Sequence, residues 1–479
     1  MTEPRRSRRA ARQEQAMMGN DPSRDPGRYQ SHVDAARRDE GLFEGLYVDP
    51  DPRGRTVAQL RRRRRRAAND IESVTKSVSL VEEDGTLYWR DGIPTRPAFR
   101  RRARRGLDAA AEGDLVLTKE FPTLAPNKVV AAIGAIDRKL NPAIDGTLCS
   151  RLRTLRRRPD GTFELQDGAG TGPFSGRTLL FVHGTFSSAA NMLGEFTAAG
   201  QPGLAFLNRA VQGSRKYDRV LFFEHPTLSV SPVINALELA RAFTGSSGTI
   251  DVIAHSRGGL VVRWWLEAFG GSLSPTAQLR VVLAGSPLHG TSLAAPDKIQ
   301  HAMSLLANVG TFAEKTIGLV GLTNPFLWVA GKLIEVIVSV AGTLSSTPLV
   351  DALAALVPGL AGQSAVDNNH EINRLRLGPV AVSPAYHAIL SNFETDNPGW
   401  RFWRNFRKDR AFDLATDVVF PGKNDLVVDT WSMTDVGVPK LRLAGTCDFG
   451  TSDTVWHCTY FRQPKAVSYI AGRFGVPLA

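Results

Sequence analysis

Cysteine is scarce in this chain. Its 479 residues include three cysteines, Cys149, Cys447 and Cys458, and no C-x-x-C pair occurs. This scarcity argues against a disulfide framework and against a structural zinc site. It fits a protein that folds in a reducing cytoplasm. The first 30 residues are rich in arginine and lack the apolar core that a secretory signal needs. We therefore expect a cytoplasmic protein that is not exported by the general route.

Long apolar runs are missing as well. The most apolar part of the chain is the stretch 299–360, and its charge-free windows, 316–331 and 336–350, both contain Gly, Ser, Thr or Pro. Each window is shorter than the roughly 20 apolar residues that span a bilayer, so no transmembrane helix is expected. Two interpretations remain open for this stretch. It forms buried core helices, or it forms a mobile apolar cap over a lipid-like substrate pocket.

Acidic residues do not balance the basic ones. The chain has 59 Lys and Arg against 47 Asp and Glu, a net charge of +12, and much of the excess lies in residues 1–110. Six arginines follow one another from Arg61 to Arg66. We expect residues 1–70 to form a disordered arm, which either solubilises the protein or contacts phosphate or an anionic membrane surface. No zinc finger, RNA-recognition motif or helix-turn-helix is evident, so nucleic acid is not an expected partner.

Residues 71–175 contain short strand-like pieces separated by turn signals such as Glu83-Asp84-Gly85. A helical stretch at about 127–140 lies among them. This pattern predicts a small α/β accessory region. The strand-like pieces are 77–81, 86–89, 115–118 and 162–165.

From residue 176 to residue 479, strand-like apolar runs alternate with helix-length segments. Such alternation predicts an α/β fold with a mostly parallel sheet and helices on both of its faces. The expected strands are 178–182, 219–223, 249–254, 279–283 and 417–420.

A sharp turn around Ser256 is the most specific motif in the chain. A strand-like run ends in the sequence AHSRGG at 254–259, and a helix-length segment follows. A nucleophile elbow requires small residues two positions before and two positions after its serine, because the strained backbone passes close to its neighbours. Ala254 and Gly258 meet this requirement. The pattern therefore predicts Ser256 as a nucleophile.

A His-Gly pair at 183–184 follows another strand-like apolar run. The loop after such a strand supplies one backbone N–H group of an oxyanion hole, and the residue after the nucleophile supplies the other. The candidates for these two donors are the main-chain N–H groups of Thr185 and Arg257.

With these two motifs, the sequence resembles the α/β-hydrolases, in particular the bacterial lipases and esterases that have an Ala-His-Ser-x-Gly-Gly elbow. The stretches FEHPTLS at 223–229 and SPLHGT at 286–291 agree with this resemblance, which covers about residues 176–479. It implies the α/β-hydrolase fold with a helical apolar cap insert at about 299–360. It also implies a catalytic triad in the chain order Ser, acid, His.

The resemblance assigns the acid to Asp425. The sequence NDLVV at 424–428 is similar to the Asn-Asp-Gly-x-Val stretch that carries the catalytic aspartate in bacterial lipases, with Leu426 in place of the glycine. Several carboxylates crowd this segment, so Asp429 and Asp417 remain competitors.

The resemblance assigns the base to His457, which follows a strand-like segment near the C-terminus. His457 would accept the proton of Ser256 and later give it to the leaving group, while the carboxylate fixes its tautomer.

The function that these assignments favour is a serine hydrolase that cleaves carboxylic esters of apolar acids through an acyl-enzyme. A small-molecule or lipid ester is the expected partner, and no cofactor or metal is expected, because no pair of histidines has ligand spacing. Two alternatives remain. One is an acyltransferase or thioesterase with the same triad, and the other is a non-catalytic scaffold that binds membranes or anions. The sequence gives no basis for an oligomeric state.

Overall fold

The computed structural model describes residues 29–47, 75–83, 85–92, 114–124, 128–198, 202–211, 216–317, 325–344, 348–395, 419–437 and 441–478. Two features of the sequence, the arginines from Arg61 to Arg66 and the competing acid Asp417, lie outside these residues.

A sheet of eight strands, in the order β11-β10-β9-β8-β6-β7-β4-β5, forms the centre of the molecule. The six strands from β11 to β7 run parallel, and β4 and β5 are antiparallel to their neighbours. The strands are β4 (Arg151–Arg157), β5 (Phe163–Gln166), β6 (Arg177–Val182), β7 (Arg219–Glu224), β8 (Thr249–His255), β9 (Gln278–Ala284), β10 (Ala385–Phe393) and β11 (Leu443–Ser452).

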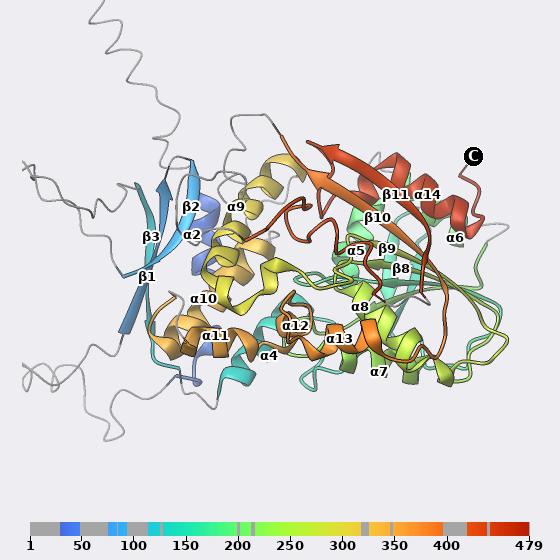
Figure 1. Cartoon of the computed structure of the whole chain (residues 1–479), viewed down its shortest axis with the longest axis horizontal. Coiled ribbons are helices and arrows are strands. Elements are labelled where there is room, and N and C mark those ends of the chain that lie inside the picture. The colour runs from blue at the N-terminus through green and yellow to red at the C-terminus, as the bar shows by residue number, and fades with distance from the viewer. Residues whose placement is uncertain are drawn as a thin grey trace, which may run out of the picture.

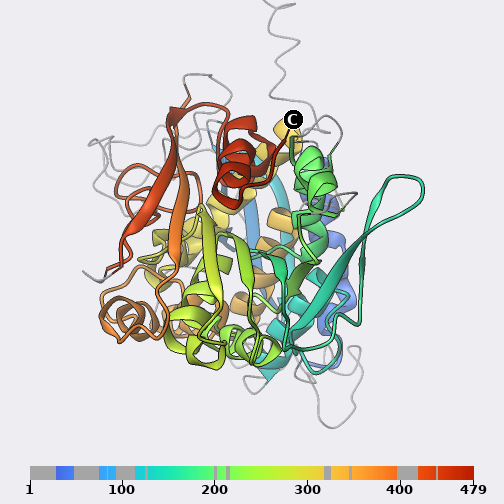
Figure 2. The ribbon, with the colours of Figure 1, turned by 90° about the vertical axis from the view of Figure 1, so that its right-hand side faces the viewer.

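Helices cover both faces of this sheet (Figure 2). Successive side chains of a strand point to opposite faces, so Leu179 and Phe181 of β6 pack with one set of helices, and Leu180 and Val182 pack with the other. The first set is α5 (Ala189–Thr197), α6 (Pro202–Val211) and α14 (Pro464–Phe474), and the second includes α7 (Pro232–Ala242) and α8 (Gly258–Arg263). The predicted α/β fold with a mostly parallel sheet is therefore confirmed.

A second layer lies beside the main sheet (Figure 1). It contains an antiparallel sheet in the order β2-β1-β3, which packs against two long helices. None of the described helices is both long enough and apolar enough to cross a membrane. The elements of this layer are α2 (Gln30–Arg37), β1 (Thr75–Glu83), β2 (Thr86–Asp91), β3 (Asp114–Pro122), α4 (Val129–Leu140), α9 (Ile299–Ile317), α10 (Pro325–Ala341), α11 (Pro348–Ala355) and α12 (Pro358–Ala361).

The stretch 299–360 forms the helices α9 to α12. Side chains of α9 and α10 are largely buried, as the interpretation as core helices expects. Polar contacts between α9 and β2 hold the layer together, because the side-chain amide of Asn308 bonds both the N–H and the carbonyl of Leu87, at 3.0 and 2.8 Å.

The expected disordered arm differs from the structure at residues 29–47, which form α2 and the short turn Glu40–Phe43. Phe43 is 1% exposed, and the hydroxyl of Tyr47 donates to Glu335 of α10 at 2.5 Å. The composition of this segment is too polar for a core of its own. It is ordered because α10 supplies the apolar surface and the buried carboxylate that it contacts.

Two further expectations also differ from the structure. The strands β4 and β5 belong to the main sheet, although they precede residue 176, because β4 pairs with β7. The strand expected at 417–420 is absent from its described part, where Val419 and Phe420 belong to no named strand. Its place in the sheet is taken by β10, beside β9.

Candidate active site

Ser256 lies in a strained turn directly after β8. Its φ is 54°, in the left-handed region that costs a non-glycine residue about 1–3 kcal/mol. The N–H group of Ser256 donates to the carbonyl of Ala284 at 2.8 Å, and α8 begins two residues later at Gly258. A Cβ atom on Gly258 would lie 2.5 Å from the carbonyl oxygen of Val182. The small residue expected here is therefore required by close packing against β6.

The loop after β6 passes just as close to Ser256. A Cβ atom on Gly184 would lie 2.6 Å from the Cβ atom of Ser256. The next residue, Thr185, lines the same pocket as Ser256, and Phe186 has a positive φ of 58°. The hydroxyl of Thr185 is held by the side-chain amide of Gln363, with Nε2 at 2.9 Å. This contact positions the loop that carries the first candidate oxyanion donor.

The second candidate donor, the N–H group of Arg257, belongs to a residue whose side chain is fully buried. The guanidinium group donates to the carbonyl of Val230 at 2.5 Å and to the side-chain oxygen of Asn235 at 2.8 Å. Burial lowers the pKa of Arg257 to about 10, and the charge of Asp137 opposes this shift. The side chain thus ties the backbone of the elbow to the loop that follows β7.

Asp137 of α4 organises that loop. Its carboxylate is fully buried and accepts hydrogen bonds from three successive N–H groups, those of Thr227, Leu228 and Ser229, at 2.9, 3.1 and 2.6 Å. The next residue of the loop, Val230, accepts the guanidinium of Arg257. No sequence motif marks Asp137, because its role depends on α4 packing beside the main sheet.

Asp425 and His457 are joined by a hydrogen bond of 2.8 Å between Oδ2 and Nδ1. An ionised carboxylate only accepts, so Nδ1 of His457 carries the proton and Nε2 is left to act as an acceptor. Asp425 is fully buried and also accepts the N–H groups of Val427 and Val428, at 3.1 and 2.8 Å, and the hydroxyl of Tyr460 at 2.8 Å. These contacts fix the carboxylate in place.

The competing acid Asp429 contacts a different partner. Its Oδ2 atom accepts the N–H group of Ser292 at 2.9 Å, and burial raises its pKa. The two aspartates are separated by a tight turn in which Leu426 has a φ of 77°. A glycine adopts such a backbone without strain, so Leu426 occupies a position that favours glycine.

A second histidine supports the backbone of His457. The ring of His255 donates through Nε2 to the carbonyl of His457 at 2.8 Å. Burial lowers the pKa of His255 to about 3, so the ring is neutral at physiological pH. His255 therefore holds the loop that carries His457 in place.

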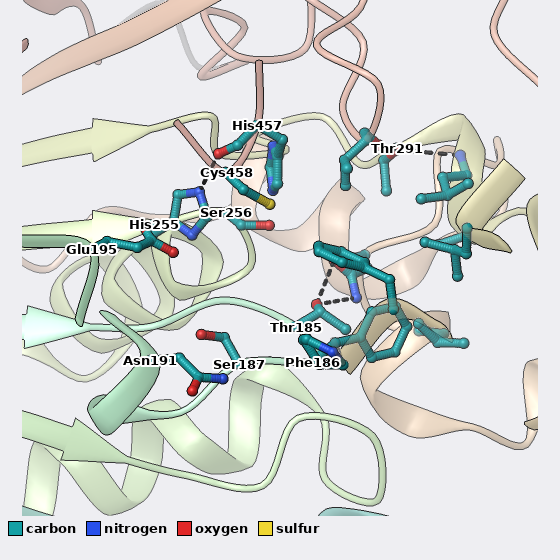
Figure 3. A pocket seen from close by; sticks show the side chains of 18 of the residues that line it. Thr185, Phe186, Ser187, Asn191, Glu195, His255, Ser256, Thr291, His457 and Cys458 are labelled. Carbon is teal, nitrogen blue, oxygen red and sulfur yellow. Dashed lines mark hydrogen bonds between the residues drawn. The ribbon is translucent and has the colours of Figure 1, made fainter. Parts of the chain in front are cut away.

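Ser256 and His457 line one cavity of about 320 Å³, together with Thr185 (Figure 3). Within the described residues, no hydrogen bond joins Ser256 to His457; such contacts often tighten only when the substrate binds. Much of the remaining wall is apolar and comes from the helices α9, α10 and α12. The apolar residues from these helices are Ile299, Met303, Leu306, Pro325, Phe326 and Leu360.

The described part of the chain contains no group of three or more His, Cys, Asp and Glu side chains that could hold a metal ion. Sequence reasoning missed three residues that support the site: Asp137, Gln363 and Tyr460. Tyr460 carries the weak signal of lying three residues after His457. The other two are far from the motifs in sequence and have no local pattern.

The sheet and its helices define an α/β protein with a mostly parallel sheet. The chain belongs to the family described as a domain of unknown function (DUF7379), whose model matches residues 153–475. No curated protein matches the chain in sequence.

Solved structures with a similar arrangement include three hydrolases. The mature lipase BlEst2 of Bacillus licheniformis is 13% identical with a TM-score of 0.33, and the alignment covers 64% of this chain and 96% of the lipase. Lipase 1 of Pelosinus fermentans is 13% identical with a TM-score of 0.38, and the alignment covers 62% of this chain and 97% of that lipase. A thermophilic esterase of Thermogutta terrifontis is 14% identical with a TM-score of 0.30, and the alignment covers 67% of this chain and 96% of the esterase.

Proposed function

We propose that this protein is a serine hydrolase that cleaves carboxylic esters of apolar acids through an acyl-enzyme on Ser256. The observation that carries this proposal is the 2.8 Å hydrogen bond from His457, which lines the same cavity as Ser256, to the buried carboxylate of Asp425. A nucleophile at a strained turn, an imidazole with a free Nε2 and a buried carboxylate that orients it are the three parts that acyl transfer requires.

In the proposed reaction, Ser256 Oγ attacks the ester carbonyl carbon while Nε2 of His457 takes the hydroxyl proton. The negative charge on the carbonyl oxygen is held by the N–H groups of Thr185 and Arg257, each worth about 3 kcal/mol of transition-state stabilisation. His457 then protonates the departing alcohol. Water attacks the acyl-enzyme with the same histidine as base, and the acid leaves.

The apolar wall supports an apolar acyl group. Side chains of α9 and α10 line the cavity, and burying their surface against an acyl chain is favourable by about 25 cal/mol per Å². A small polar ester would leave this surface in contact with water. We therefore expect activity to increase with acyl chain length until the cavity is filled.

Covalent labelling tests the nucleophile. A fluorophosphonate probe should label the protein at one serine, and Ser256→Ala should abolish the labelling. The matched control Ser175→Ala changes an exposed serine before β6 and should label like the parent protein. Absence of labelling in the folded parent protein would refute the catalytic proposal and favour a scaffold.

The acyl preference is tested separately with p-nitrophenyl esters from acetate to decanoate. We expect kcat/KM to rise from the shortest chain to a medium chain. A steady decrease with chain length would contradict the assignment of the apolar wall to the acyl group. Addition of an alcohol acceptor distinguishes hydrolysis from acyl transfer, because a transferase yields the new ester as the main product.

A further inference from the structure

The wall of the cavity is polar where α5 forms it. Cavity-lining residues of α5 and the turn before it lie at helical spacing, at positions 187, 190, 191, 194 and 195, so one face of the helix meets the cavity. Asn191 and Glu195 are polar members of this face, and Arg462 lines the same cavity. In Figure 3, Asn191 and Glu195 lie on one side of Ser256, and Thr291 lies on the other.

These polar groups are not satisfied by the protein. Asn191 is exposed and Glu195 is half-buried, and within the described residues their side chains make no hydrogen bond to the protein. No ion pair joins Glu195 to Arg462. The Nε atom of Arg462 is buried and also has no partner. A bound ligand would shield these groups from water, and a ligand that offers no hydrogen bonds in return would leave them unpaired. This part of the wall therefore fits a ligand with hydrogen-bonding groups.

The charge state of this part of the wall indicates which class of polar ligand it can bind. Burial raises the pKa of Glu195 to about 8, and the nearby positive charge of Arg462 only partly opposes this shift. At pH 7 the Glu195 carboxyl group is thus mostly protonated, so it can both donate and accept a hydrogen bond. A cationic alcohol would meet Arg462 and no full counter-charge. A hydroxyl group, which also donates and accepts, matches both side chains.

We propose that Asn191, Glu195 and Arg462 form a subsite for the alcohol part of the ester, and that this alcohol carries free hydroxyl groups, as in a partial ester of a polyol. The acyl chain then lies against α9 and α10, and the polyol lies against α5, with Ser256 between them. This inference rests on the proposed ester hydrolysis and adds the chemical class of the leaving group.

Two esters with one carbon skeleton test the subsite. Propyl decanoate and 1-monodecanoylglycerol differ only by the two hydroxyl groups of the alcohol, so their ratio of kcat/KM measures recognition of those groups. At pH 7 we expect the parent protein to prefer the glycerol ester by at least about 10-fold, since sites that bind substrate hydroxyls discriminate strongly. A ratio near 1 would overturn the proposal.

Variants of Glu195 assign the effect to the subsite. Glu195→Leu should lower kcat/KM for the glycerol ester more than kcat/KM for the propyl ester, so that the preference falls about 10-fold. Glu195→Gln, a neutral donor and acceptor, should retain the preference. The control Glu120→Leu changes an exposed carboxylate on β3 and should retain the preference. Equal slowing of both esters by Glu195→Leu would overturn the subsite.

The pH dependence and the labelling complete the test. Raising the pH above 8 ionises Glu195, so the preference should fall in the parent protein and stay constant in Glu195→Gln. A protein that reacts with the fluorophosphonate and hydrolyses both esters equally refutes the subsite alone. A folded protein that neither reacts nor hydrolyses either ester refutes the proposed function, and the subsite with it.

Discussion

Removing the carboxylate of Asp137 tests how the second layer supports the elbow. Asp137 accepts the N–H groups of Thr227 and Leu228, both fully buried, and that of Ser229, which is partly exposed. A buried N–H group that loses its partner costs about 1–3 kcal/mol. Asp137→Ala leaves two such groups unpaired, so we expect the free energy of unfolding to fall by about 2–6 kcal/mol. Asp137→Asn keeps one acceptor oxygen and should lose about half as much.

Replacing Asp137 should also slow the covalent labelling of Ser256. The loop that Asp137 holds carries the carbonyl of Val230, which accepts the guanidinium of Arg257, and the charge of Asp137 is felt by that guanidinium. A shift of the loop would move the N–H group of Arg257 away from the position that we propose for it beside the oxyanion. We expect Asp137→Asn to react with a fluorophosphonate about 10-fold more slowly, because small misplacements of catalytic groups are costly.

Urea unfolding and labelling kinetics measure the two effects on the same samples. Asp145→Asn is the matched control, because Asp145 lies in the same region with 55% of its side chain exposed, and its loss should cost less than about 0.5 kcal/mol. A free energy of unfolding of Asp137→Ala within about 0.5 kcal/mol of the parent value, together with an unchanged labelling rate, would contradict both predictions.

Three further predictions concern single residues. Asp425→Asn presents an amide N–H to Nδ1 of His457 and favours the wrong tautomer, so kcat for ester hydrolysis should fall about 10³–10⁴-fold; a loss of less than about 10-fold would contradict the triad. Gly184→Ala brings a Cβ atom to 2.6 Å from the Cβ atom of Ser256, so the rate of fluorophosphonate labelling should fall about 10²-fold. An unchanged labelling rate would show that the loop is free to move. Burial lowers the pKa of His32 to about 4, so the unfolded state takes up a proton at this residue first as the pH falls. The contribution of His32 to the free energy of unfolding should be fully present above pH 6.5 and decline by about 3 kcal/mol towards pH 4. Urea unfolding midpoints of His32→Gln should lack this part of the decline.

The strands β6 to β9 and the elbow were predictable from the sequence, because their signals are local. Each strand has six or seven residues, most of them apolar, and the turn at Ser256 is marked by small residues on both sides. Strand β10 was missed. Its sequence includes His387, Ser391 and Asn392, whose side chains find partners on other elements, as Ser391 does with Tyr460 at 3.0 Å. Such residues interrupt an apolar pattern without interrupting a strand.

The order of residues 29–47 could not be predicted for a related reason. Phe43 and Tyr47 belong to a short apolar group in an otherwise polar segment, and their burial depends on α10, almost 300 residues further along the chain. The supporting roles of Asp137 and Gln363 have the same origin. Each contacts its partner only because distant elements meet in the fold.

The amino-acid sequence by itself determined where the strained turn lies, since the backbone at Ser256 can pass close to its neighbours only with small residues at fixed positions near it. The sequence also placed the candidate acids of the triad in one short segment, residues 417–429. The tertiary structure decided that Asp425, and not Asp429, meets His457. That choice depends on how the loops after β10 and β11 meet at the ends of two parallel strands, and on a tight turn that points two nearby carboxylates at different partners. A hydrogen bond between residues distant in the chain is a property of that arrangement, and no local pattern of residues specifies it.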